Sequence, residues 1–117
     1  MTGLVSVIIP NYNYGRFLET TIKSVLSQTA SSVDLIIVDN GSTDDSREVL
    51  DKYRGELNAI FQNNQCQASA RNTGLAHAKG SLIAFLDADD YWEPTKLERQ
   101  KELIREDAQL IYTGIRR

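Results

Sequence analysis

The sequence contains a single cysteine, Cys66, and a single histidine, His77. One cysteine cannot form an internal disulfide, and without a C-x-x-C pair it gives no sign of a zinc site. His77 lies in an alanine-rich segment, where we expect a structural or surface role. Neither a G-x-S-x-G motif nor a G-x-G-x-x-G after a predicted strand is present, so nucleophilic triads and dinucleotide dehydrogenases have little support.

An excess of basic residues and a long apolar run are absent as well. The chain has 13 Lys and Arg against 16 Asp and Glu, so it lacks the charge of a nucleic-acid-binding protein. No segment approaches the roughly 18 apolar residues of a membrane span, and the N-terminus does not resemble a signal peptide. We expect a cytoplasmic protein, attached to a membrane only if a further C-terminal part provides the attachment. Its 117 residues, 41% of them apolar, fit one domain over 1–117.

Strand-like and helix-like segments alternate along the chain. Short apolar runs predict strands, at 4–10, 33–38, 57–61, 81–86 and, in the tail, 109–115. Apolar residues at helical spacing, or a high alanine content, predict helices, at 17–29, through 49–53, at 68–80 and at 95–107. Because the strands are apolar throughout, they indicate a mostly parallel sheet with helices on both faces. The predicted fold class is an open, Rossmann-like α/β sheet.

Local patterns also predict where some helices begin and end. The pairs Ser42-x-x-Asp45 and Thr95-x-x-Glu98 resemble capping boxes, which would start two of the helices. Gly80 is expected just past the end of the alanine-rich helix. In sheets of this class, ligands bind beyond the carboxyl ends of the strands, so the loops after the strands are where functional residues are expected.

The stretch FLDADD places three carboxylates directly behind the fourth predicted strand. Asp87 and Asp89 would repel each other unless donors or a cation held them. Magnesium or manganese would fit, since these ions take one or two carboxylates and complete their coordination with water and phosphate oxygens. The implied partner is a phosphorylated substrate. The alternative, more frequent for a lone D-x-D, is that the acids only solvate the loop and cap the following helix.

Other candidate residues occupy the remaining loops. Asp39 ends the second predicted strand, and it is either a ligand contact or a turn former before Asn-Gly-Ser. Arg71, near the start of a predicted helix, could donate to a phosphate or a base edge, although an exposed arginine without a ligand is the commoner case. Tyr12 and Tyr14 could stack on a base or pack on their own scaffold.

Five segments, in order, resemble the family 2 glycosyltransferases. These segments are VSVIIPNYN, SVLSQT, DLIIVDNGSTDDS, ARNTGLAHAKG and SLIAFLDADDYW, and together they cover most of residues 4–97. The family has the GT-A fold and transfers a sugar from a nucleotide diphosphate sugar to an acceptor. The resemblance therefore implies that this chain is the N-terminal, nucleotide-sugar-binding portion of such an enzyme, with UDP as the favoured nucleotide.

The resemblance also implies roles for individual residues. Donor-binding positions would be Pro10, Tyr12, Asp39, Arg71 and Asp87. Asp39 would accept a hydrogen bond from the base, which in uridine is the ring N3–H. Asp89, supported by Asp87, would bind Mn²⁺ or Mg²⁺ between the two phosphates. The cation would stabilise the charge that builds on the leaving nucleotide diphosphate.

The sequence departs from the family in two ways. Cys66 stands where the family usually has glycine, which would strain the backbone if this position needs a positive φ. The family's catalytic base, which deprotonates the acceptor hydroxyl in inverting transfer, is expected downstream of the chain; Asp107 is the acid that follows the last motif's helix, and nothing marks it as that base. The acceptor class (glycan, lipid-linked sugar or protein) stays open.

Two other functions stay open at this point. A catalytically silent nucleotide-binding or assembly module would have the same binding motifs without the base. A phosphoaspartate protein would have a similar length and an acidic strand end, although Tyr91 stands where a D-x-D-x-[TV] phosphatase has threonine. Because a nucleotide-binding half exposes apolar surface, we also expect a homodimer at high concentration.

Overall fold

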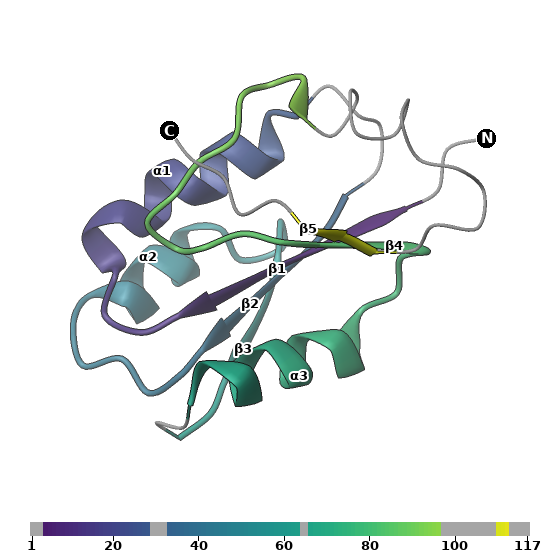
Figure 1. The fold of residues 1–117 in the computed structure, drawn as a ribbon. Coiled ribbons are helices and arrows are strands. Elements are labelled where there is room, and N and C mark those ends of the chain that lie inside the picture. The colour runs from purple at the N-terminus through teal and green to yellow at the C-terminus, as the bar shows by residue number, and fades with distance from the viewer. Residues whose placement is uncertain (1–3, 29–32, 64–65, 97–109, 113–117) are drawn as a thin grey trace.

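The computed structural model of the chain describes residues 4–28, 33–63, 66–96 and 110–112. The strands form one sheet in the order β3-β2-β1-β4-β5, and every neighbouring pair is parallel (Figure 1). Their bounds are β1 Val5–Asn11, β2 Val33–Asp39, β3 Asn58–Phe61, β4 Leu82–Phe85 and β5 Leu110–Tyr112. The helices are α1 Gly15–Leu26, α2 Ser46–Lys52 and α3 Gln67–His77. The predicted α/β class with a parallel sheet is confirmed.

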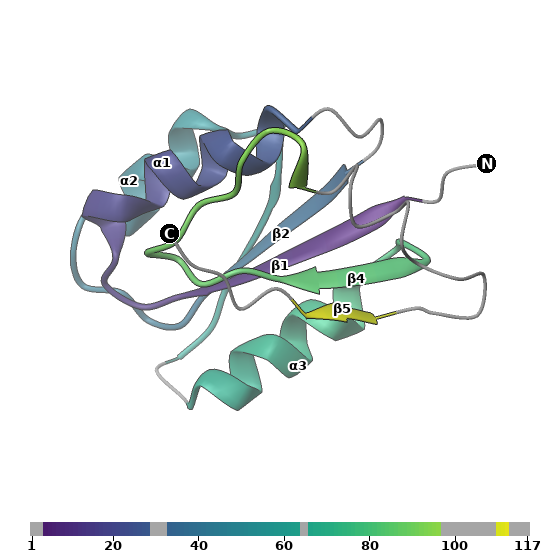
Figure 2. The same cartoon turned by 45° about the horizontal axis from the view of Figure 1, so that its top comes forward.

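The helices cover both faces of the sheet, with α1 and α2 on one face and α3 on the other (Figures 1 and 2). Side chains alternate between the two faces along a strand, so β1 contributes to two cores. Val5, Val7 and Ile9 belong to the larger core together with residues of α1 and α2, whereas Ile8 belongs to the core that includes Ala70 of α3. All seven residues of β1 are buried, which explains its uninterrupted apolar sequence.

Helix α3 ends three residues before the glycine that was expected to end it. It stops at His77, and Ala78 has extended backbone angles (φ −71°, ψ 137°). Gly80 is required for another reason: a Cβ there would lie 2.5 Å from the Leu4 carbonyl oxygen and 2.7 Å from the Ser6 nitrogen. The glycine therefore allows a close approach to the start of β1, and the helix-cap prediction was wrong.

The Ser42-x-x-Asp45 capping box is also not formed. Helix α2 begins at Ser46, and Asp45 in the capping position makes no side-chain cap hydrogen bond. Asp44 takes that role, since its Oδ1 accepts from the Ser46 backbone N–H at 2.9 Å and from the Ser46 hydroxyl at 2.6 Å. The second predicted box and most of the helix at 95–107 lie outside the described residues.

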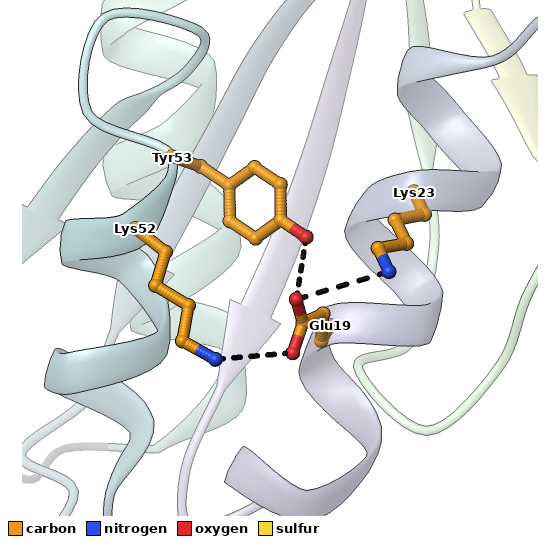
Figure 3. A network of polar contacts seen from close by, with 4 residues as sticks. All are labelled: Glu19, Lys23, Lys52 and Tyr53. Atoms are coloured by element: carbon orange, nitrogen blue, oxygen red, sulfur yellow. Dashed lines mark hydrogen bonds and ion pairs between the residues drawn. The ribbon is translucent and has the colours of Figure 1, made fainter.

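A polar network joins α1 to α2 on the sheet face that they share (Figure 3). Glu19 accepts a hydrogen bond from the Tyr53 hydroxyl at 2.8 Å, and the Nζ atoms of Lys52 and Lys23 lie 3.4 and 3.9 Å from its carboxylate. The hydrogen bond from Tyr53, aided by the lysines, lowers the pKa of Glu19 against the opposing effect of desolvation. Desolvation, reinforced by Glu19, raises the pKa of Tyr53 to about 12. Within the part of the chain that the structure describes, no helix is long and apolar enough to cross a membrane.

Candidate functional site

The candidate residues lie at the carboxyl edge of the sheet. All strands run in the same direction, so the loops that follow β1, β2 and β4 meet at this edge, together with the N-terminal end of α3 (Figures 1 and 2). The register places Asn11, at the end of β1, directly beside Asp39, at the end of β2. The sequence prediction that these loops gather is confirmed.

Asp39 is the centre of a buried hydrogen-bond network. Its side chain is 3% exposed. Oδ1 accepts from Asn11 Nδ2 at 2.8 Å and from the Ser42 hydroxyl at 2.7 Å, and Oδ2 accepts from the Ser42 backbone N–H at 3.0 Å. A carboxylate offers about four lone pairs, and these hydrogen bonds use three of them. The Asn11 side-chain oxygen is buried and has no partner among the described residues. The sequence analysis included this residue in the motif VSVIIPNYN but gave it no role of its own.

Asn13 fixes the loop after β1 to the loop after β2. It has a left-handed backbone (φ 58°), which asparagine adopts more readily than most residues. Its Oδ1 accepts from the backbone N–H groups of Thr43 and Asp44 at 2.7 and 3.2 Å, and its own N–H donates to the Ser42 hydroxyl at 2.8 Å. In the sequence, the turn-prone stretch NYNYG was only a weak sign of this role.

Asp44 adds a second connection between these loops. Its Oδ2 accepts from the N–H of Gly15, the first residue of α1, at 2.9 Å. Desolvation raises the pKa of Asp44, but hydrogen bonds from Ser46 and Gly15 outweigh it and bring the pKa below its ordinary value. The carboxylate is therefore kept ionised, and it holds the start of α1 against the start of α2.

The two tyrosines of the first loop are both exposed, each by 41%. Tyr14 packs against the ring of Phe17, with the ring centroids 6.1 Å apart. Tyr12 stands directly after β1 and presents a ring at the carboxyl edge, where a flat ligand could stack on it. Pro10 is buried within β1, where it pairs with Val38 of β2.

Arg71 and Asp87 form an ion pair across the α3 side of the sheet. Arg71 lies in the second turn of α3, and Asp87 follows β4 by two residues. The distance from Nη2 to Oδ1 is 4.0 Å, and the side chains are 36% and 59% exposed. Two residues that the sequence predicted at a common site are therefore brought together, with their charged groups facing solvent.

The acidic segment alternates in exposure. Asp87 and Asp89 are exposed, whereas Ala88 and Asp90 are buried. The Asp90 N–H donates to the Asp87 carbonyl at 3.0 Å and thereby closes a tight turn, and Asp90 Oδ1 accepts from the Tyr91 N–H at 2.8 Å. Only two of the three carboxylates thus point outward, and the third serves the local backbone.

The donor set of this edge suits a hard cation that is shared with a ligand. Within residues 4–28, 33–63, 66–96 and 110–112, no three His, Cys, Asp or Glu side chains are grouped closely enough to hold a metal by themselves. Asp87 and Asp89 offer outward carboxylate oxygens, which Mg²⁺ and Mn²⁺ accept in ones and twos when phosphate and water complete the coordination. The residues fit a cation that binds together with a phosphorylated ligand.

Cys66 does not strain the loop before α3. Its backbone angles are φ −71° and ψ 161°, which any residue adopts, and it occupies the capping position of α3. Strain was expected only if this position had a positive φ, and it does not. Asp107 lies outside the described residues.

Comparison with known proteins gives the same family as the motifs. The family model described as "Glycosyl transferase family 2" matches residues 6–117. An uncharacterized glycosyltransferase of Nostoc sp. is 50% identical over 105 residues, which are 86% of this chain and 33% of that protein. The UDP-Glc:alpha-D-GlcNAc-diphosphoundecaprenol beta-1,3-glucosyltransferase WfaP of Escherichia coli is 44% identical over 99 residues, 83% of this chain and 39% of that protein. The chain thus spans a third to two fifths of the length of these two relatives.

Two solved structures share the fold. Residues 1–349 of S. aureus TarS, in complex with UDP-GlcNAc, superpose with a TM-score of 0.74 at 28% identity, covering 85% of this chain and 30% of that one. The mannosyltransferase PcManGT of Pyrobaculum calidifontis, in complex with GDP-Man and Mn²⁺, gives a TM-score of 0.74 at 26% identity, covering 79% and 29%. The family model matches nearly the whole length of this chain, and the solved structures share its GT-A sheet. This chain therefore belongs to the family 2 glycosyltransferases.

Proposed function

We propose that this chain is the donor-binding part of a glycosyltransferase that binds a UDP-sugar together with Mn²⁺ or Mg²⁺ for inverting transfer to an acceptor hydroxyl. The observation that carries the proposal is the pairing of Arg71 with Asp87 beside the outward carboxylate of Asp89 at the carboxyl edge. A basic fork next to two exposed acids matches a diphosphate bridged by a divalent cation. The acceptor stays open between a glycan, a lipid-linked sugar and a protein.

Each site residue has a role in this proposal. Asp39 accepts a hydrogen bond from the uracil N3–H through the lone pair left on Oδ2, Tyr12 stacks on the base, and Pro10 contributes main-chain contacts. Arg71 donates to the diphosphate. Asp87 supports the ribose and the metal region, and Asp89 binds the cation, which as a Lewis acid would stabilise the leaving diphosphate. We assign the catalytic base to none of the described residues.

Named relatives support the nucleotide and the metal. The E. coli relative is named as a transferase that uses UDP-Glc, and the superposed TarS structures contain UDP or UDP-GlcNAc. The superposed mannosyltransferase contains Mn²⁺ with GDP-Man, which supports a divalent cation and leaves GDP as the second nucleotide to test.

Calorimetric titration with UDP tests the proposal. In Mn²⁺, the Asp89→Ala variant should bind UDP at least about tenfold more weakly than the unmodified chain, and EDTA should remove most of this difference because the carboxylate acts through the cation. Asp51→Ala is the matched control, since Asp51 is an exposed acid in α2, away from the carboxyl edge. Failure to bind UDP or GDP in the presence of Mn²⁺ or Mg²⁺ would refute the proposal.

A further inference from the structure

A row of polar side chains on α1 lies where apolar side chains would be expected. Thr21, Ser24 and Gln28, the last of them just past the helix end, are 0%, 9% and 9% exposed. Their spacing of three and four residues places them on one side of the helix, next to Ile22 and Val25 of the core. Buried polar groups destabilise the fold unless they are hydrogen-bonded, so their partners indicate their purpose.

All three side chains bind the backbone of the segment that follows β4. The Thr21 hydroxyl lies 2.7 Å from the carbonyl oxygen of residue 88 and 2.5 Å from that of residue 90. Ser24 Oγ accepts from the Trp92 backbone N–H at 3.1 Å, and Gln28 Nε2 donates to the carbonyl of residue 93 at 2.8 Å. In both views this segment runs alongside α1 (Figures 1 and 2). The contacts span 65 to 69 residues of sequence and attach the segment to the helix at four points.

Thr21 differs from the other two residues, because two of its three carbonyl partners belong to the residues on either side of Asp89; the third is the Phe17 carbonyl of α1, at 3.2 Å. The hydroxyl has one proton and can donate to one of them at a time, but both peptide groups converge on it. The segment is further fixed by its buried side chains at positions 88, 90 and 92, which are 2%, 6% and 4% exposed. As a result, the intervening residues Asp87, Asp89 and Tyr91 are turned outward.

We propose that Thr21 is a positioning residue for the acid pair. Its hydroxyl lies between the carbonyl groups of the residues before and after Asp89 and donates to one of them at a time, and Ser24 and Gln28 extend the attachment, so that the Asp89 carboxylate is held in place for the cation before the nucleotide arrives. The inference rests on the proposed donor-binding function. A carboxylate on a free loop would have to be ordered during binding, which weakens affinity, whereas one on an anchored segment is preorganised.

The test compares Thr21→Val, which keeps the shape and removes the hydroxyl, with Thr21→Ser, which keeps the hydroxyl. Trp92 is the only tryptophan of the chain and lies in the attached segment, so its fluorescence reports the attachment without any ligand. In Thr21→Val we expect acrylamide quenching of Trp92 to rise at least twofold and UDP affinity in Mn²⁺ to fall about tenfold. UDP affinity in EDTA should change less than twofold, and Thr21→Ser should restore both properties to within about threefold.

Thr20→Val is the matched control, because Thr20 is an exposed threonine one position away on the same helix, and it should change neither property. If circular dichroism shows that Thr21→Val does not fold, Gln28→Leu replaces it, with the same pattern expected at about threefold in Mn²⁺. Unchanged quenching, or a loss of UDP affinity that is equal in Mn²⁺ and EDTA, overturns the inference. If the unmodified chain binds no UDP while Thr21→Val still raises quenching, the proposed function fails and the attachment stands.

Discussion

Replacing Arg71 with methionine would separate the contribution of this residue to stability from its proposed contribution to nucleotide binding. Arg71 Nη2 lies 4.0 Å from Asp87 Oδ1, at the outer limit of an ion pair, and the side chains are 36% and 59% exposed. Exposed pairs of this kind contribute roughly 0 to 1 kcal/mol, and methionine retains much of the apolar stem. We therefore expect Arg71→Met to change the free energy of unfolding by less than about 1 kcal/mol, as measured by urea denaturation.

The effect of the same substitution on nucleotide binding should be much larger. A hydrogen bond from a guanidinium to a phosphate oxygen contributes about 1.5 to 3 kcal/mol, which corresponds to roughly a 10- to 150-fold change in Kd. If Arg71 donates to the diphosphate, calorimetry with UDP and Mn²⁺ should show a loss in that range. Raising the salt concentration should reduce the difference between Arg71→Met and the unmodified chain, because the interaction is ionic.

Arg54→Met is the control that the chain offers. Arg54 makes a shorter ion pair, 3.3 Å to Asp51, with side chains that are 81% and 58% exposed, and it follows the end of α2 that points away from the carboxyl edge. It should alter neither stability nor UDP affinity appreciably. The reasoning is refuted if Arg71→Met destabilises the fold by more than about 2 kcal/mol with UDP affinity intact, or if Arg54→Met weakens UDP binding equally.

Two further predictions concern packing and pH. Gly74→Ala would place a Cβ 3.3 Å from Ile8 Cγ1 and closer still to Cγ2. Because overpacking should outweigh the gain in helix propensity, urea denaturation should show that the free energy of unfolding falls by about 1 to 2 kcal/mol. Unchanged stability would contradict the close packing of α3 against β1. Tyr53→Phe removes a hydrogen-bond donor that lowers the pKa of Glu19 in the folded protein. The substitution should therefore destabilise the fold fully near neutral pH. This effect should fade as the pH falls below the ordinary Glu pKa of 4.5 and through the lower pKa that Glu19 has in the folded state. It should also fade as pH rises from 10 through the Tyr53 pKa of about 12, and an effect independent of pH between 3 and 11 would count against the network.

The fold was largely predictable because burial on both faces makes parallel strands uniformly apolar. The runs at 4–10 and 33–38 could be recognised for that reason, and they became β1 and β2 with one or two residues of difference. The order of the strands could not be predicted, since local periodicity contains no information about which strands are neighbours. The errors at Gly80 and at the Ser42 capping box have the same origin. Gly80 is needed for its close approach to the start of β1, and the Ser42 hydroxyl binds Asp39 at the end of β2. Both residues also happen to match a helix-end motif in the local sequence.

The site was predictable in its location and less so in its contacts. Asp39, Arg71 and Asp87 could be assigned to one edge because parallel strands end together, whereas the pairing of Arg71 with Asp87 depends on how α3 lies on the sheet. The roles of Asn11 and Thr21 were not predicted, since each binds partners that lie 28 to 69 residues away in the sequence. Thr21 nevertheless had a detectable signal: it falls beside Leu18 and Ile22, on the predicted apolar face of an amphipathic helix.

The charges at the carboxyl edge give a reason why the proposed binding should need a divalent cation. Asp87 and Asp89 are both turned outward, on the segment whose backbone carbonyls at residues 88 and 90 lie against the Thr21 hydroxyl. Arg71 lies 4.0 Å from the carboxylate of Asp87 and offsets part of its negative charge. A diphosphate would add at least two more negative charges, and like charges about 4 Å apart repel by roughly 4 kcal/mol at an effective dielectric constant of 20. A divalent cation between the Asp89 carboxylate and the phosphates would turn that repulsion into attraction, so under the proposed function the crowding of the acids would favour a metal-bound nucleotide over the free one.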